Sequence, residues 1–381
     1  MEPFDETVDE LNKHLACDNQ NWLFGAGISY EANIPLMVTL TRRVEKLIPD
    51  GDFKRLYYDI SDDLPDNYHI EHVLSHVGDY IAVSERSKHK SIELKGKKHT
   101  IDELVNLHSE LVKHIGETIR YGYTEPDTVK GIPEKIGTII EPIVDIKNHR
   151  DFVQTLISSK SNLLTRSSIS IFTTNYDTLM EDALALEKQS VNDGFTGAAI
   201  GFWNPDVSFN SNYGLNLIKL HGSVDWLRDI KDGLIRNRYG VNYLESPSNV
   251  LIYPQATKYV ETQKDPFASL FTKLRERLNS PFDHIFATAG YSFGDYHINS
   301  ELELALKSQG NKTILIVFID KINDTLLSWL KYEAMAKKIF IATGEGIYHS
   351  SETLISKSGV AMLNWWKFSE LTKFLKDGEA L

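Results

Sequence analysis

The sequence predicts an α/β protein whose mostly parallel sheet is covered by helices on both faces. Short apolar runs rich in β-branched residues recur from residue 169 onward, with helical periodicity between them. A similar run near the N-terminus leads into a glycine turn. The block of residues 50–165 has helical periodicity and many charged residues instead, which predicts a helical insertion between the first strand and the later ones.

The N-terminal elements follow from apolar spacing and from proline. Apolar residues at helical spacing predict a first helix over residues 6–19, and a strand is expected at about 21–24. Pro35 suits the first turn of a helix that runs to about Ile48. Within the insertion, the lysine-rich piece 86–99 is expected to be a solvated loop.

The second half predicts strands and helices in alternation. Strands are expected at residues 168–172, 215–220, 250–253, 284–289, 313–318 and 339–342. Helices are expected at residues 176–188, 266–279, 297–308 and 323–336. The series is expected to close with a helical tail over 346–381, which leaves no room for a separate sensor domain.

Composition excludes several classes of protein. With 41% hydrophobic and 25% charged residues, the 381-residue chain can bury a sizeable core. A net charge of −12 argues against strong direct binding to nucleic acid, because phosphate neutralisation needs clustered Lys and Arg. No apolar run reaches the ~18 residues of a membrane span, and the acidic N-terminus is unlike a signal peptide. We expect a soluble, cytoplasmic protein with no membrane partner.

The glycine turn is the first candidate site. Gly25, Ala26, Gly27 and Ser29 follow the first strand. Such a turn can seat a phosphate, because glycines let the main chain approach the anion while free N–H groups and a helix dipole attract it. Alone, a Gly-x-Gly after an apolar run is more often a plain tight turn.

Three later strands are followed by similar small or polar segments. They are the segments Thr173-Thr174-Asn175-Tyr176-Asp177, His221-Gly222-Ser223 and the longer stretch from Gly290-Tyr291-Ser292 to Asn299. Each could be a helix cap or a turn. Ligands of doubly wound sheets bind at the carboxyl ends of the strands, so four such segments together favour one shared binding site.

In this order and spacing, the motifs GAGIS, TTNYD, KLHGS and GYSFGDYHIN resemble those of the sirtuin family. More closely, they are similar to the bacterial sirtuin-like NAD-degrading effectors of anti-phage defence. The resemblance implies a Rossmann-like NAD-binding domain formed by residues 1–49 and 166–345. The helical insertion at 50–165 is not covered by these motifs.

The resemblance also implies residue roles, position by position. Asn175 matches the asparagine that helps to place a water beside the nicotinamide ribose, and His221 matches the catalytic histidine. The cofactor-binding positions are Gly25, Ala26, Gly27, Ser29, Thr174, Asp177, Gly222, Gly290, Tyr291, Ser292 and Asn299. Asp177 among them matches the residue that hydrogen-bonds the nicotinamide amide.

Two departures from sirtuin deacylases stand out. The single cysteine, Cys17, cannot form their four-cysteine zinc module, so no zinc is expected. Ile34-Pro35 is followed by Leu36-Met37-Val38 where deacylases have Asp-Phe-Arg. Both departures argue against protein deacylation and are expected of the sirtuin-like NAD hydrolases, so the resemblance implies hydrolysis of NAD⁺ to nicotinamide and ADP-ribose. A non-catalytic NAD- or ADP-ribose-binding subunit and a zinc-free deacylase remain as alternatives.

The resemblance further implies partners. Single-domain sirtuin-like proteins of this kind are similar to those encoded beside a HerA-type hexameric ATPase, and a homo-oligomer is expected. Other features point to less specific surfaces. The residues His69, His72 and His76 lie near one helical face, but a packed or solvated face is favoured over a metal pair.

Overall fold

A computed structural model describes residues 2–158, 169–209, 215–229, 231–238, 248–251, 265–360 and 362–379. It divides into two compact units. The first contains the chain up to Ala32 and most of the chain from Asp145 onward, and the second contains residues 33–144. The expected boundaries at 49/50 and 165/166 differ from this division: the helix after Pro35 falls in the second unit, and residue 165 lies outside the described residues.

The first unit is built on a sheet of nine described strands in the order β18-β17-β16-β15-β14-β1-β6-β10-β7. The strands are β1 (Gln20–Phe24), β6 (Ser170–Thr173), β7 (Val191–Asn192), β10 (Leu215–Lys219), β14 (His284–Ala289), β15 (Thr313–Phe318), β16 (Ile339–Thr343), β17 (Gly346–His349) and β18 (Leu354–Ile355). All neighbours from β7 to β16 pair in parallel. The prediction of a mostly parallel sheet is confirmed.

Strand order reverses at β1. From β1 the chain proceeds outward to β6 and β10, and then returns to the other side of β1 with β14, β15 and β16. This is the strand order of a doubly wound dinucleotide-binding fold, in which the crevice at the reversal point is the usual ligand site. The topology therefore directs attention to the ends of β1 and β14.

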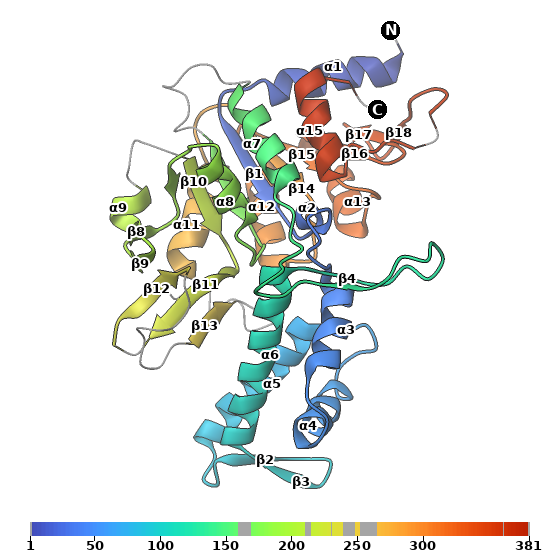
Figure 1. Cartoon of the computed structure of the whole chain (residues 1–381). Helices are drawn as coiled ribbons and strands as arrows, with labels where there is room; N and C mark the ends of the chain where they lie inside the picture. The colour runs from blue at the N-terminus through green and yellow to red at the C-terminus, as the bar shows by residue number, and fades with distance from the viewer. Residues whose placement is uncertain are drawn as a thin grey trace. The chain divides into compact units, whose positions relative to one another are not determined.

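Helices cover both faces of this sheet, as the sequence predicts. The described helices of this unit are α1 (Pro3–Leu15), α2 (Gly27–Tyr30), α7 (Lys147–Ser158), α8 (Leu179–Leu186), α9 (Pro205–Phe209), α11 (Phe267–Leu278), α12 (Tyr296–Lys307), α13 (Asp324–Leu330), α14 (Glu333–Ala336) and α15 (Phe368–Asp377), of which α9 packs on a smaller sheet. Trp22 and Phe24 of β1 pack with α7 and α15, which lie side by side (Figure 1). Leu23, between them, is equally buried but points to the other face, because strand side chains alternate.

A smaller antiparallel sheet in the same unit has the order β13-β11-β12-β9-β8. Its strands are β8 (Phe195–Gly197), β9 (Ile200–Trp203), β11 (Gly222–Asp229), β12 (Gly233–Asn237) and β13 (Ser248–Leu251). The strand expected at 250–253 thus belongs to this sheet, although residues 252 and 253 lie outside the described residues. β11 begins two residues after β10 ends, so His221 sits where the chain leaves the main sheet.

The second unit is mainly helical, with α3 (Met37–Leu47), α4 (Asp52–Ser61), α5 (Ile70–Arg86) and α6 (Ile101–Tyr121). Its helices bury an aliphatic core that includes Leu104, Leu107 and Leu111. It also has two short hairpins, β2 (Ser91–Leu94) with β3 (Lys97–Thr100), and β4 (Tyr123–Thr124) with β5 (Lys135–Ile136). No described helix in either unit is long and apolar enough to cross a membrane.

Two expectations about local structure were wrong. The piece 86–99 is not only a loop, because Lys95 and Gly96 both adopt positive φ (48° and 77°) and form the two-residue turn of the β2–β3 hairpin. The stretch from residue 346 does not begin as a helical tail. A two-residue turn after Thr343 folds the chain back, and β17 and β18 extend the main sheet before α15.

A buried histidine in α7 makes stability depend on pH. His149 is 1% exposed, and neither ring nitrogen has a hydrogen-bond partner in the structure as described. Burial lowers its pKa from 6.5 to about 4. Below pH 6.5 the unfolded chain therefore binds a proton that the folded chain does not accept until about pH 4.

His149→Phe should accordingly reduce the loss of stability on acidification. As the pH falls from 6.5 to 4, the imidazole lowers the free energy of unfolding progressively, by about 3 kcal/mol at pH 4. Phe fits the aromatic surroundings, since the ring centroid of His149 lies 5.0 Å from that of Phe368. Urea unfolding of both proteins at pH 7 and pH 4.5 measures the difference, and an equal loss in both would contradict this account.

Candidate functional site

Four neighbouring strands end level with one another. In the register of the main sheet, Phe24 of β1 pairs with Ala289 of β14 on one side and with Thr173 of β6 on the other, and Thr173 pairs with Lys219 of β10. Each of the four segments singled out in the sequence begins at one of these residues or within two residues after it. They therefore leave the same edge of the sheet side by side, centred on the point where strand order reverses.

The turns after β1 and β14 interlock through their glycines. A Cβ on Gly25 would lie 2.4 Å from the carbonyl oxygen of Gly290, and a Cβ on Gly27 would lie 2.6 Å from Gly290 Cα. Gly290 has φ +63°, and its own Cβ would lie 2.4 Å from Ile28 N. Glycine is needed at these positions because the two backbones touch. This packing is a second reason for the glycines, beside the expected approach of an anion.

This packing also uses most of the amide groups of the first turn. The N–H groups of Gly25 and Gly27 donate to Ala289 O (3.1 Å) and Gly290 O (3.0 Å), and those of Ile28 and Ser29 donate within the turn. The expectation of several free N–H groups is therefore wrong. Within the described residues, Ala26 has the one amide of the turn without an acceptor, and Ala26 is also exposed. The following helix, α2, has only four residues.

Ser29, Asp177 and Asn175 form a buried hydrogen-bonded chain across β1 and β6. Ser29 Oγ donates to Asp177 Oδ2 (2.8 Å), and Asn175 Nδ2 donates to Ser29 Oγ (3.1 Å). Leu179 N–H donates to the other carboxylate oxygen of Asp177 at 3.0 Å. Asn175 Oδ1 is buried without a partner in the described structure. The chain fixes the Asn175 amide and leaves one acceptor for a water or a ligand hydroxyl.

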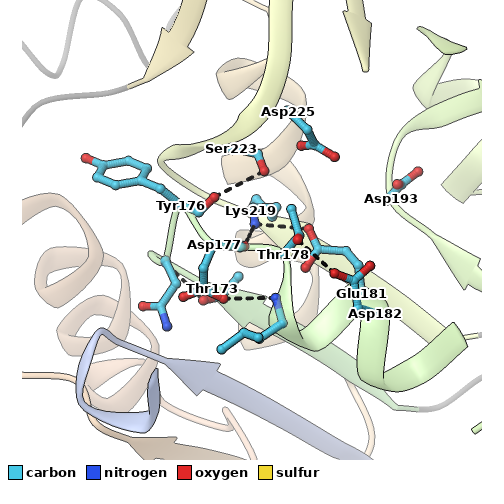
Figure 2. A network of polar contacts seen from close by, with 12 residues as sticks. Thr173, Tyr176, Asp177, Thr178, Glu181, Asp182, Asp193, Lys219, Ser223 and Asp225 are labelled. Atoms are coloured by element: carbon cyan, nitrogen blue, oxygen red, sulfur yellow. Dashed lines mark hydrogen bonds and ion pairs between the residues drawn. The ribbon is translucent and has the colours of Figure 1, made fainter. Parts of the chain in front are cut away.

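A buried lysine holds this segment in place from the adjacent strand. Lys219, at the end of β10, is 2% exposed; its Nζ donates to Asp177 O and lies 3.0 Å from Glu181 Oε1 (Figure 2). Burial raises the pKa of Glu181, and the charge of Lys219 opposes that rise. Tyr176 O also accepts hydrogen bonds, from Val224 N (3.0 Å) and Ser223 Oγ (3.3 Å). The segment after β6 is thus tied to both β10 and β11.

His221 pairs with a carboxylate that the sequence reasoning did not single out. His221 Nε2 lies 2.7 Å from Asp295 Oδ2, and both side chains are buried. Asp295 is also the N-cap of α12, because its Oδ1 accepts from the N–H groups of His297 (2.9 Å) and Ile298 (3.4 Å). The histidine after β10 is therefore connected to the segment after β14, on the far side of β1.

The remaining expected positions have more structural roles. Both ends of the Asn299 side chain are used inside its own segment: its Oδ1 accepts from Tyr291 (3.0 Å) and its Nδ2 donates to Phe293 O (2.7 Å). Burial and the charge of Asp295 raise the pKa of Tyr291. Ser292 is exposed at the tip of the turn.

Two further expected residues lie at strand ends. Thr174 is half-buried, and its N–H donates to Phe24 O at 3.0 Å, continuing the ladder between β1 and β6. Gly222, with φ +87°, begins β11. Among the expected site residues, the structure brings Ser29, Asn175 and Asp177 into direct contact, while Thr174 and Gly222 contribute to the strands themselves.

Other parts of the described chain do not form a comparable site. His69 and His72 stack with centroids 3.8 Å apart, but no group of three or more His, Cys, Asp or Glu is arranged to hold a metal ion within the described ranges. A cavity of about 270 Å³ borders β10 and α11, lined in part by Asn216, Lys273 and Phe282. None of its lining residues belongs to the expected site.

Comparison with known proteins connects these strand ends to a family. Residues 169–335 match the family model of the SIR2-like domain. This stretch, a little under half of the chain, is therefore similar to a SIR2-like domain. The match includes the segments after β6, β10 and β14 but not the glycine turn after β1. No curated protein is significantly similar to the chain.

Two solved structures resemble the chain over most of its length. One, from work on the mechanism and regulation of Sir2 enzymes, is 10% identical with a TM-score of 0.35, covering 84% of this chain and 88% of that one. The other, a serine-to-alanine mutant of a Sir2 homologue in complex with ADP-ribose, is 12% identical with a TM-score of 0.39, covering 97% and 95%.

The interlocked turns predict a sharp difference between two glycines. Gly25→Ala should destabilise the fold by about 2 kcal/mol or more, because its Cβ would overlap rigid backbone 2.4 Å away. Gly294→Ala, in the segment after β14, is the matched control, since its Cβ would meet only Ser292 Oγ at 3.4 Å. Urea unfolding compares the two, and equal stabilities would contradict the described contact.

Proposed function

We propose that this SIR2-like protein hydrolyses NAD⁺ at the bond between nicotinamide and ribose, releasing nicotinamide and ADP-ribose. The observation that carries the proposal is the buried Asn175 amide. Ser29 fixes its Nδ2, and its Oδ1 has no partner in the described structure. An acceptor fixed in this way, at the strand ends of a doubly wound sheet, is suited to orient a water or a ribose hydroxyl.

The chemistry needs few strong acids or bases. The electron pair of the bond between ribose C1′ and nicotinamide N1 leaves with nicotinamide, which departs as a neutral molecule. Water then forms the new bond to C1′ and gives up a proton. His221 is the base we propose for that proton, because histidine is the side chain that most often serves as a general base. Asn175 holds the water in place, and polar groups around the ribose stabilise the oxocarbenium-like transition state.

Residues at the strand ends can be assigned to the parts of an NAD⁺ molecule. Ala26, with its unbonded amide, and Ser292 are both exposed and follow β1 and β14 at the reversal point of the sheet, where a pyrophosphate would bind. Asp177, fixed by Ser29 and by Leu179 N–H, would receive the nicotinamide amide. Gly27 and Gly290 shape the turns through their contact.

Asn175→Ala and His221→Ala should each lower the rate of NAD⁺ cleavage by about 100-fold or more, since one positions the nucleophile and the other accepts its proton. Chromatography of nicotinamide and ADP-ribose measures the rate. Urea unfolding of each variant beside the wild-type protein serves as the folding control. Undiminished cleavage in both variants would refute the assigned mechanism. Binding without turnover in the wild-type protein and its complexes would favour the non-catalytic NAD- or ADP-ribose-binding subunit instead.

We further propose that NAD⁺ depletion serves anti-phage defence and that the chain acts as a homo-oligomer with a HerA-type hexameric ATPase. The resemblance of the four motifs to those of such effectors supports this proposal. Exposed aliphatic side chains of the second unit are available for contacts, since Val129 and Ile140 are 94% and 92% exposed and Ile139 is 75% exposed. Sedimentation of the chain alone and with such an ATPase tests this, and a monomer in both would contradict it.

A further inference from the structure

The contact between His221 and Asp295 has a chemical consequence for the proposed hydrolysis. Asp295 Oδ2 lies 2.7 Å from His221 Nε2, and its Oδ1 caps α12 through the N–H groups of His297 and Ile298. The carboxylate is therefore fixed from two sides. A histidine held in this way has a defined ring orientation, and the nitrogen that bears its proton is defined as well.

The helix cap decides which partner carries the proton between them. Two backbone N–H groups and the positive end of the helix dipole stabilise Asp295 as an anion. An ionised carboxylate can only accept a hydrogen bond. Nε2 of His221 must then be the protonated nitrogen, and in the neutral imidazole the lone pair lies on Nδ1.

We propose that Asp295 is a positioning residue that holds His221 in the Nε2–H tautomer, so that Nδ1 is the atom that accepts the proton during hydrolysis. This rests on the proposed function for the step itself. When C1′ of the ribose bonds to the water oxygen, the water proton moves to Nδ1 of His221. The ring then carries protons on both nitrogens, and the Asp295 carboxylate balances the new positive charge.

His221 and Asp295 are far apart in the sequence and come from opposite sides of the central strand. His221 follows β10 and Asp295 follows β14, with β6 and β1 between them in the sheet. Tyr291 supports the turn that carries Asp295, since its hydroxyl donates to Asp295 O at 3.3 Å. The aspartate thus bridges the two halves of the doubly wound sheet over the strand ends where Asn175 lies.

Asp295→Asn isolates the charge from the cap. Asparagine also caps helices, so α12 should persist, but its amide would donate to Nε2 and favour the opposite tautomer. Cleavage of NAD⁺ should fall by about 100-fold or more in kcat with little change in KM. Asp295→Ser is the second variant, because serine keeps a capping oxygen and lacks the charge. Wild-type kcat in both variants would overturn the proposal.

Nuclear magnetic resonance tests the tautomer without any enzyme assay. Long-range ¹H–¹⁵N spectra of the whole ¹⁵N-histidine-labelled chain, with His221 assigned by comparison with His221→Gln, should show Nε2 protonated and Nδ1 bearing the lone pair. In Asp295→Asn the pattern should reverse. A wild-type Nδ1–H tautomer would overturn the proposal even if NAD⁺ is cleaved. The expected tautomer in a protein that cleaves no NAD⁺ would refute the hydrolase function and support the pairing.

Discussion

The contact between the glycine turns after β1 and β14 is the constraint on which the site depends. Gly25 and Gly27 approach Gly290 so closely that none of the three can carry a side chain without moving backbone. β1 and β14 are neighbours at the point where strand order reverses. The glycine contact fixes the two turns that follow them relative to each other. The two turns that would receive a dinucleotide are therefore rigid before any ligand binds.

Polar side chains extend this rigidity to the neighbouring strands. Ser29 connects the first turn to Asn175 and Asp177 after β6, and Lys219 ties Asp177 O to β10. Buried polar groups are costly when unpaired, so a chain of satisfied groups is both stable and specific in geometry. Within the described chain of Ser29, Asn175 and Asp177, Asn175 Oδ1 is the acceptor left unpaired, and it calls for a ligand or a water.

Much of this arrangement can be predicted from the sequence, and the remainder has physical reasons. Apolar runs and turn residues predict the strands and their carboxyl ends, because a buried parallel sheet leaves that signal in the chain. The partners of His221 and Asp177 could not be predicted in this way. Asp295 and Lys219 reach them through contacts between strands, and no local spacing in the sequence reveals such contacts. The sequence Ser-Phe-Gly-Asp before a helix predicts an N-cap. It does not indicate that the capping aspartate also contacts a histidine.

The short hairpins were missed for a related reason. A Lys-Gly turn is a weaker hairpin signal than Asn-Gly, and the four-residue strands on either side of it are too short to show alternation. The second unit also takes α3 from the expected nucleotide-binding part, because this helix buries Leu40 and Val44 and packs against α5 and α6. The periodicity of an amphipathic helix shows that it has an apolar face. It does not show against which core that face packs, because tertiary contacts decide this.

The most direct test of the central claim is an experimental structure of the protein with bound ADP-ribose. The account predicts that the pyrophosphate lies beside Ala26 and Ser292, with the ribose next to Asn175, over the carboxyl ends of β1, β6 and β14. ADP-ribose bound instead in the cavity between β10 and α11, or no ADP-ribose bound at millimolar concentration, would contradict it.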